Sequence, residues 1–244
     1  IDAIDSAAID PATAAVSLSV AASGGVSASI AVAVTIVEAD YGTRTRAFID
    51  ASDVTATTGD VMVDARSSGS IFLEGYGVGV SVAAGAAAIS GGGVGVVARV
   101  VSDAVTEALI SGGSDVDALA GGVRVDALDE RTIDIDALGV TIGVAGGSLA
   151  IAGTVTVIEA VADYASTVRA AILDSAVTAG AGNVIVDADA TTSSLLRADG
   201  VSFSLAASGG ISGSFAAAAG VVKNTLAQVV EALIVDSDAA GGQG

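Results

Sequence analysis

Closely spaced aspartates are the only recurrent polar pattern in this chain that could do chemistry. Residues i and i+2 of a β-strand point to the same side, so such a pair could offer two hard oxygen ligands to Ca²⁺. The chain has neither an EF-hand loop nor a G-G-x-G-x-D nonapeptide run. Solvation of outward strand faces is the alternative interpretation. The candidate calcium ligands are Asp115 and Asp117, Asp134 and Asp136, Asp187 and Asp189, and Asp236 and Asp238.

Other catalytic chemistry has little support in the composition. The chain has no His and no Cys, which removes imidazole bases, thiolate nucleophiles and Cys or His zinc sites. Two carboxylates could serve a glycosidase, but aromatic residues for a sugar-binding cleft make up only 3% of the chain. The glycine-rich stretches 75–79 and 91–95 do not complete a phosphate-binding motif. We therefore expect no enzymatic activity.

Charge and hydropathy narrow the range of partners. The chain has nine Lys and Arg residues against 28 Asp and Glu, a net charge of −19, which makes nucleic acid an unsuitable partner. Four long runs carry no charge: residues 11–37, 75–98, 137–158 and 200–222. Because these runs consist largely of Ala, Gly, Val and Ser, lack flanking basic residues and recur once per repeat, we expect no membrane span.

A repeat of about 62 residues organises the whole chain. The motif V-x-V-D-A places aspartates at Asp64, Asp126 and Asp187, and the chain opens on the end of another copy at Asp2. A second marker recurs with the same period at Asp50, Gly112, Asp174 and Asp236. We expect a single array with units at about 4–65, 66–127, 128–188 and 189–244, the last of them truncated inside a longer array.

Alternating apolar residues predict strands within each unit. Val16, Leu18 and Val20, and then Val26 to Ile36, alternate with small or polar residues, a period typical of strands with a buried face. The sequence therefore predicts an all-β fold, a parallel β-solenoid. A round coil made from one whole repeat would enclose too wide an interior for such small side chains, so we expect about three rungs per repeat. The alternatives are an antiparallel array and one short helix per repeat, near residues 102–110 and 223–234.

The order of residues in a unit resembles a known class of repeats. Residues 45–65 follow T-x-A-x-I-x-x-S-x-V-x-A-x-x-G-x-V-x-V-x-A, and G-x-G-x-S-V-A runs such as 77–83 come next. This order resembles the repeats of giant bacterial filamentous surface proteins, the haemagglutinin-like and leukotoxin-like adhesins and related β-strand-repeat proteins. The resemblance implies export to the cell surface and a non-enzymatic role as a structural stalk or filament segment. The expected partners are neighbouring repeats or other copies, end to end or laterally. The alternative is a module that binds calcium or a surface polysaccharide.

Overall fold

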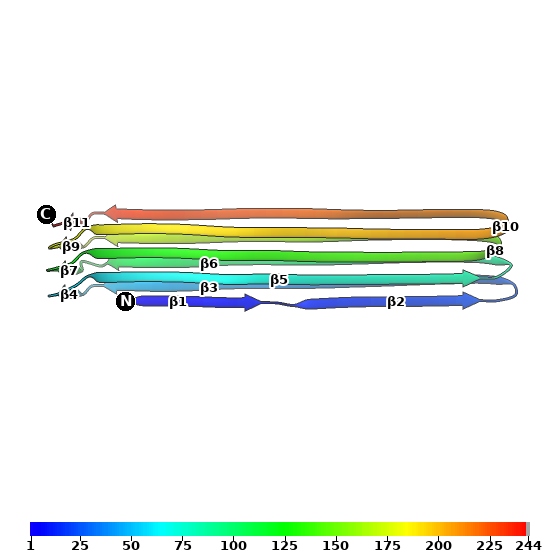
Figure 1. Cartoon of the computed structure of the whole chain (residues 1–244), viewed down its shortest axis with the longest axis horizontal. Coiled ribbons are helices and arrows are strands. Elements are labelled where there is room, and N and C mark those ends of the chain that lie inside the picture. The colour runs from blue at the N-terminus through cyan, green and yellow to red at the C-terminus, as the bar shows by residue number, and fades with distance from the viewer. Residues whose placement is uncertain (243–244) are drawn as a thin grey trace.

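The computed structural model describes residues 1–242, and almost all of them lie in parallel β-strands (Figure 1). Within these residues there is no helix able to cross a membrane. The strands are β1 (Asp2–Ile9), β2 (Ala12–Ala22), β3 (Val26–Asp50), β4 (Asp53–Ala56), β5 (Val61–Ala84), β6 (Ala87–Ser111), β7 (Asp115–Ala118), β8 (Val123–Leu173), β9 (Ala176–Ala179), β10 (Val184–Val235) and β11 (Asp238–Ala240).

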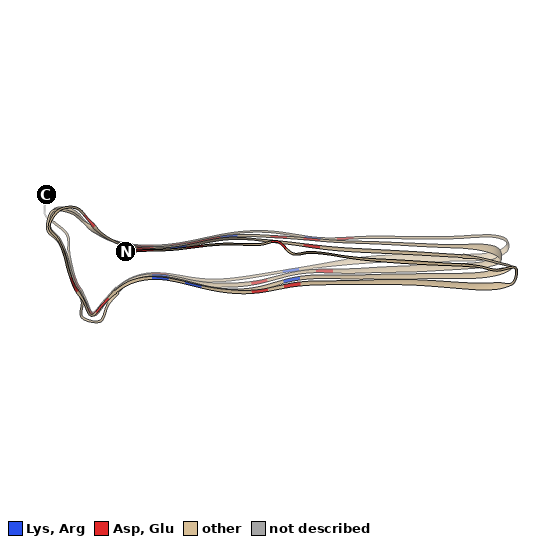
Figure 2. Ribbon diagram, turned by 90° about the horizontal axis from the view of Figure 1, so that it is seen from below, with Lys and Arg blue, Asp and Glu red and all other residues tan. Residues whose placement is uncertain are grey.

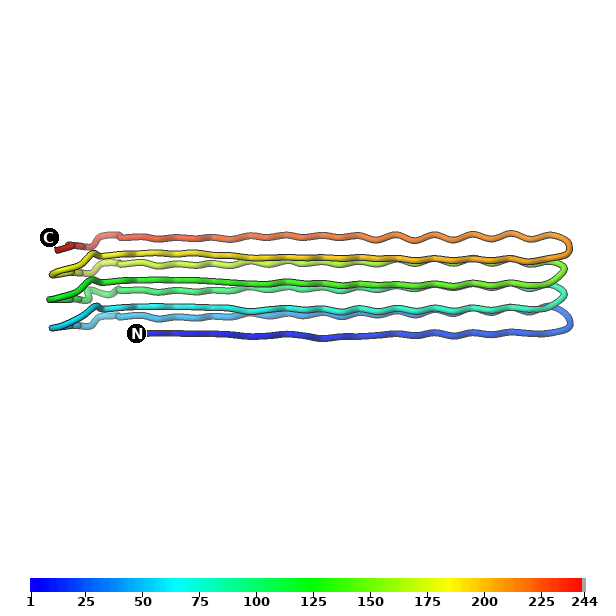
Figure 3. Tube along the Cα trace, in the orientation of Figure 1, coloured from blue at the N-terminus to red at the C-terminus, as the bar shows by residue number. Residues whose placement is uncertain are grey.

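Each repeat forms one flattened coil of the solenoid. In the second coil, β5 runs out to a tight turn, which we call the tip, β6 returns beside it, and β7 crosses the opposite end, which we call the head (Figures 1 and 3). In the third and fourth coils one continuous strand, β8 or β10, passes round the tip. In the first coil Pro11, which has no amide hydrogen to donate, separates β1 from β2.

The register between coils follows the sequence repeat. Asp2 pairs with Asp64, Asp64 with Asp126, and Asp126 with Asp187, always in parallel. Every strand pair in the described residues is parallel, which confirms the parallel β-solenoid and excludes the antiparallel array. Residues 102–110 lie in β6 and residues 223–234 in β10, so the alternative of one helix per repeat is wrong.

The expectation of three rungs per repeat is wrong, because one repeat makes one rung. It assumed a round interior. Figure 2 shows instead a flattened coil, in which the outgoing and returning strands run alongside each other from the tip to the head and the chain spreads apart at the head. A long perimeter therefore encloses a thin layer of side chains, and small residues can fill it.

The buried face of the strands nearest the tip is the opposite of the one that the alternation indicated. In β3 the side chains of Ser29, Ala31 and Thr35 are buried, whereas Ile30 and Val34 are 71% and 61% exposed. The same inversion holds in β2, where Ser17 and Ser19 face the interior and Val16, Leu18 and Val20 face outward. Small and polar residues line the interior because the two sheets approach too closely there for larger side chains.

Close approach of the sheets depends on inward glycines and hydroxyl pairs. A Cβ on Gly77 would lie 2.5 Å from Cγ1 of Val94 in the facing strand. Across the same gap, the hydroxyl oxygens of Ser81 and Ser90 are 2.8 Å apart, and those of Thr141 and Thr156 are 2.7 Å apart. The largest buried residues, Ile71, Leu73 and Tyr164 among them, pack farther from the tip and form the main core together with Val94, Val96 and Ile158.

Each coil turns into the head through a residue with left-handed backbone geometry. This position is occupied by Ala51 (φ 46°), Gly112 (φ 70°), Asp174 (φ 48°) and Asp236 (φ 48°). Asp50, the residue that the sequence repeat places at this marker, instead ends β3 and pairs with Ser111. In the first unit the marker residue therefore lies one position before the corner. Gly and Asp tolerate positive φ better than most residues, which explains their recurrence at this corner.

Candidate functional site

A ladder of serines runs along the corner between the returning strands and the head. The backbone N–H of Ser52 donates to Oγ of Ser114, that of Ser114 to Oγ of Ser175, and that of Ser175 to Oγ of Ser237, at 3.2, 3.2 and 3.1 Å. Each of the four hydroxyls donates in turn to a carbonyl of its own coil, at 2.6–2.8 Å. The ladder links all four coils through one side chain per repeat.

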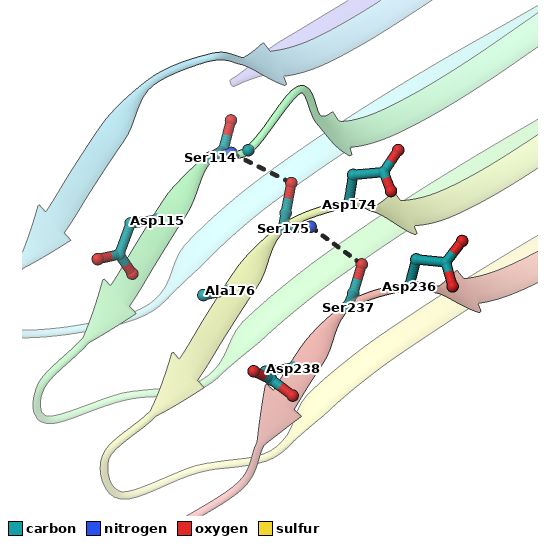
Figure 4. Close-up of a pocket in the computed structure, with 9 residues that line it drawn as sticks. Ser114, Asp115, Asp174, Ser175, Ala176, Asp236, Ser237 and Asp238 are labelled. Atoms are coloured by element: carbon teal, nitrogen blue, oxygen red, sulfur yellow. Dashed lines mark hydrogen bonds between the residues drawn. The ribbon is translucent and has the colours of Figure 1, made fainter.

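Four carboxylates flank this ladder and line a shallow groove of about 350 Å³. Figure 4 shows Asp174 and Asp236 on one side of the serines and Asp115 and Asp238 on the other. The two members of the predicted pair Asp236 and Asp238 therefore do not share a face. The reason is that Asp236 lies in the left-handed corner and not in a strand, so the i, i+2 argument does not apply to it.

The other predicted pairs lie in strands, as expected, but at separate places. Asp115 and Asp117 share the outer face of β7, since Val116 and Ala118 are buried. Asp134 and Asp136 lie on the outer face of β8, in a pocket of about 100 Å³ that Glu74 of β5 and Arg197 of β10 also line. Since Asp136 pairs in register with both Glu74 and Arg197, a cation of the protein itself already stands next to this acidic pair.

The pair Asp187 and Asp189 begins the outgoing side of β10. Asp187 is the last member of a column of stacked aspartates that also contains Asp2, Asp64 and Asp126. Arginines from neighbouring positions offset the repulsion in this column: Arg66 lies 2.7 Å from Asp64, and Arg124 lies 3.2 Å from Asp126 and 3.8 Å from Asp187. These contacts favour the interpretation that the aspartates belong to the outer face, where arginines partly cover Asp64 and Asp126 and where Asp187 is exposed.

Calcium binding at these aspartates stays a prediction. Among residues 1–242, no three acidic side chains converge closely enough to hold a metal ion. Ca²⁺ usually takes six to eight oxygen ligands, so each pair would need backbone carbonyls, water or another molecule to complete its coordination.

A buried polar cluster between the coils was not predicted from the sequence. Arg131 and Asp129, with side chains 1% and 0% exposed, are 3.0 Å apart inside the third coil. The guanidinium reaches across the second coil, where Ser67 accepts a hydrogen bond, to the first coil, where it donates to Thr43 at 2.9 Å and lies 5.5 Å from the ring centre of Tyr41. Gly69 leaves room for it, since a Cβ there would meet Nη1 of Arg131.

Tyr164 completes this cluster by donating a hydrogen bond to Asp129. Burial and the contact with Asp129 raise the pKa of the Tyr164 hydroxyl well above its ordinary value. The charged groups of Asp129 and Arg131 are buried, and Tyr41 and Thr43 of the first coil are half-buried. The role of the cluster is therefore structural: it ties three successive coils together at one level of the solenoid.

Charge also alternates along one outer column of the returning strands. Arg46, Glu107, Arg169 and Glu231 stack in successive coils, with Arg46 2.5 Å from Glu107 and Arg169 3.5 Å from Glu231. Arg46 therefore pairs with a glutamate of the next coil. Positive and negative side chains alternate in this column because successive coils stack in the register of the sequence repeat.

Comparison with known proteins found no matching family model, no similar curated protein and no similar solved structure. Any functional conclusion must therefore come from the geometry of the molecule.

Proposed function

We propose that this chain is a structural segment of a bacterial surface fibre, non-enzymatic and rigid through stacked coils. One observation carries the proposal: each coil presents to the next a complete edge of backbone donors and acceptors, in a register that matches the sequence repeat. A coil is thus a template for another coil, whether from the same chain or from a second copy. The adhesin-like repeats that the sequence resembles support placing such a fibre outside the cell.

Both outer edges of the described coils are free to continue this stacking. Within residues 1–242, β1 to β4 have no partner on one edge, and β10 and β11 have none on the other. A second copy stacked on the fourth coil would place its Arg46 beside Glu231 and its Glu38 beside Lys223, extending two charge columns with opposite charges. It would also place its Asp53 beside Asp238, but Asp53 and Asp115 already stack in the same way within the chain.

Oxidative cross-linking tests end-to-end stacking. Arg44 and Val229 occupy the same outer column in the first and fourth coils. In a stacked pair they would be neighbours about 4.8 Å apart, within the Cα distances of a disulfide. Because the chain has no Cys, the double variant Arg44→Cys/Val229→Cys should form a ladder of disulfide-linked multimers on a non-reducing gel.

The matched control is Arg44→Cys/Thr225→Cys. Thr225 faces outward on the same strand but four positions away, which displaces the thiol by about 13 Å along the strand. It should give few multimers. Equal yields from the two double variants, or none from either when circular dichroism shows that both are folded, would refute in-register stacking.

A further inference from the structure

A grid of large apolar side chains covers the outer face of the outgoing strands near the tip. We call it the outward grid. In each coil three alternate residues contribute to it, and the parallel register aligns them into three columns of four. Its members are Val16, Leu18, Val20, Val78, Val80, Val82, Val140, Ile142, Val144, Val201, Phe203 and Leu205. In the first and last coils these side chains are 47–76% exposed.

The part of each coil nearest the tip, residues 11–37, 75–98, 137–158 and 200–222, has no charged side chain, and we call it the wing. Figure 2 shows no Lys, Arg, Asp or Glu in the part of the molecule nearest the tip. Many of the larger side chains point outward in the wing, while mostly small or hydroxyl-bearing residues and a few valines and isoleucines fill its interior. Apolar surface is therefore exposed where solvent would ordinarily meet polar residues. Contiguous exposed apolar patches of this kind mark interaction surfaces.

We propose that the outward grid is the interface with a second copy of this chain, packed wing against wing. The shape of the sheet supports this partner. The strands stack with little twist (Figures 1 and 3), and flat sheets are usually stabilised by stacking on another sheet. Four coils about 4.8 Å apart, with about eleven uncharged residues per outgoing strand, offer about 700 Å² to a partner, close to the area each protein buries in a standard interface.

Charge selects the orientation of the two copies. The net charge of −19 lies entirely outside the wings, so copies with their heads at the same end would bring like charges together. A two-fold axis parallel to the direction of coil stacking places the heads at opposite ends and the two grids face to face. Both copies then still present free coil edges, so this lateral pairing does not depend on the end-to-end stacking proposed above.

Two outward aspartates test whether the grid forms the interface. Val80 and Ile142 pair in register at the centre of the grid. The variant Val80→Asp/Ile142→Asp should raise the dimer dissociation constant about a hundredfold or more, because both charges would be buried at the contact. The control Ser70→Asp/Thr132→Asp adds the same charges to the same coils and face, outside the wing, and should dimerise like the parent chain. Sedimentation velocity over a concentration series measures both.

A more conservative variant controls for the possibility that the aspartates prevent folding. Val80→Thr/Ile142→Thr keeps β-branched side chains and should weaken the dimer while circular dichroism stays unchanged. An unchanged dissociation constant in both the Thr and the Asp variants would overturn the proposal. So would a parent chain that stays monomeric but floats with phosphatidylcholine vesicles, because lipid would then be what covers the grid.

Spin-label distances separate lateral pairing from end-to-end stacking. A label at Val80→Cys should show a short distance between copies, on the order of 10–20 Å across two packed sheets. One at Ser70→Cys, ten positions nearer the head, should give about 66 Å, since the two copies run in opposite directions. End-to-end stacking alone would give about 19 Å at both sites, four coils apart, and that result would contradict the wing interface.

Discussion

At the scale of single residues, Arg131 is the side chain whose loss the fold should tolerate least. It is buried and contacts Asp129 in its own coil, Ser67 in the coil before and Thr43 in the first coil. Sequence analysis could not find this cluster, because most of its contacts join positions 35 to 90 apart and only the register brings them together. Nothing distinguishes Arg131 in the sequence from the arginines on the outer face.

We expect Arg131→Met to lower the free energy of unfolding by about 3–5 kcal/mol, because Asp129 would stay buried without its cation. Urea unfolding followed by circular dichroism measures this. The double variant Asp129→Leu/Arg131→Met removes both charges and should recover most of the loss. If the single and double variants were equally unstable, packing volume and not the unpaired charge would be the cause.

At the scale of elements, the straight strands keep one register and the turns absorb differences in length. The first coil has three residues between Ala22 and Val26 at the tip, whereas the second has two between Ala84 and Ala87. The fourth coil has an extra residue at its tip, between Ser208 and Ile211, and the second has an extra glycine, Gly113, at the corner. These insertions explain why the spacing of the repeat markers varies by one position.

Two glycines in the wing allow a direct test of sheet spacing. Gly77→Ala should destabilise the fold by about 1–3 kcal/mol, because its Cβ would overlap Val94 across the thin interior. Gly93 lies on the outer face, where a Cβ would meet nothing closer than 4.0 Å. We expect Gly93→Ala to be neutral or slightly stabilising, as is usual when a strained conformation is not required.

Thermal or urea unfolding of these two glycine variants tests whether the distance between the sheets limits the stability of the wing. Equal effects would mean that intrinsic strand propensity, and not the distance between the sheets, sets the stability of the wing.

At the scale of the whole molecule, the sequence was sufficient to predict an all-β parallel solenoid and its period, because the V-x-V-D-A aspartates stack in one column. It was not sufficient to predict the number of rungs per repeat, since alternation has the same period in a round and in a flattened coil. The buried face was misassigned for a related reason. The general preference for apolar interiors favours Val and Ile inside, but the narrow gap admits Ser29 and Ala31 instead.

The concentration of negative charge toward the head should make stability depend on salt. We expect the melting temperature to rise between about 10 and 150 mM NaCl, as the screening length falls from about 30 to 8 Å. Differential scanning calorimetry at low protein concentration measures this. No change over that range would mean that the arginine contacts already neutralise the repulsion.

The same measurement tests the predicted calcium ligands. CaCl₂ and MgCl₂ at equal ionic strength screen charge alike. A melting temperature that is higher with calcium than with magnesium, and that a chelator lowers again, would therefore assign a specific calcium site to the paired aspartates.

The single rung per repeat has a consequence for the mass per length of any fibre built from this chain. Each whole repeat advances the fibre axis by only about 4.8 Å. A fibre of such coils is therefore wide and has a high mass per length. It is about three times shorter than a fibre of the same mass built from coils of roughly twenty residues. Scanning transmission electron microscopy of unstained fibres would measure this mass per length directly.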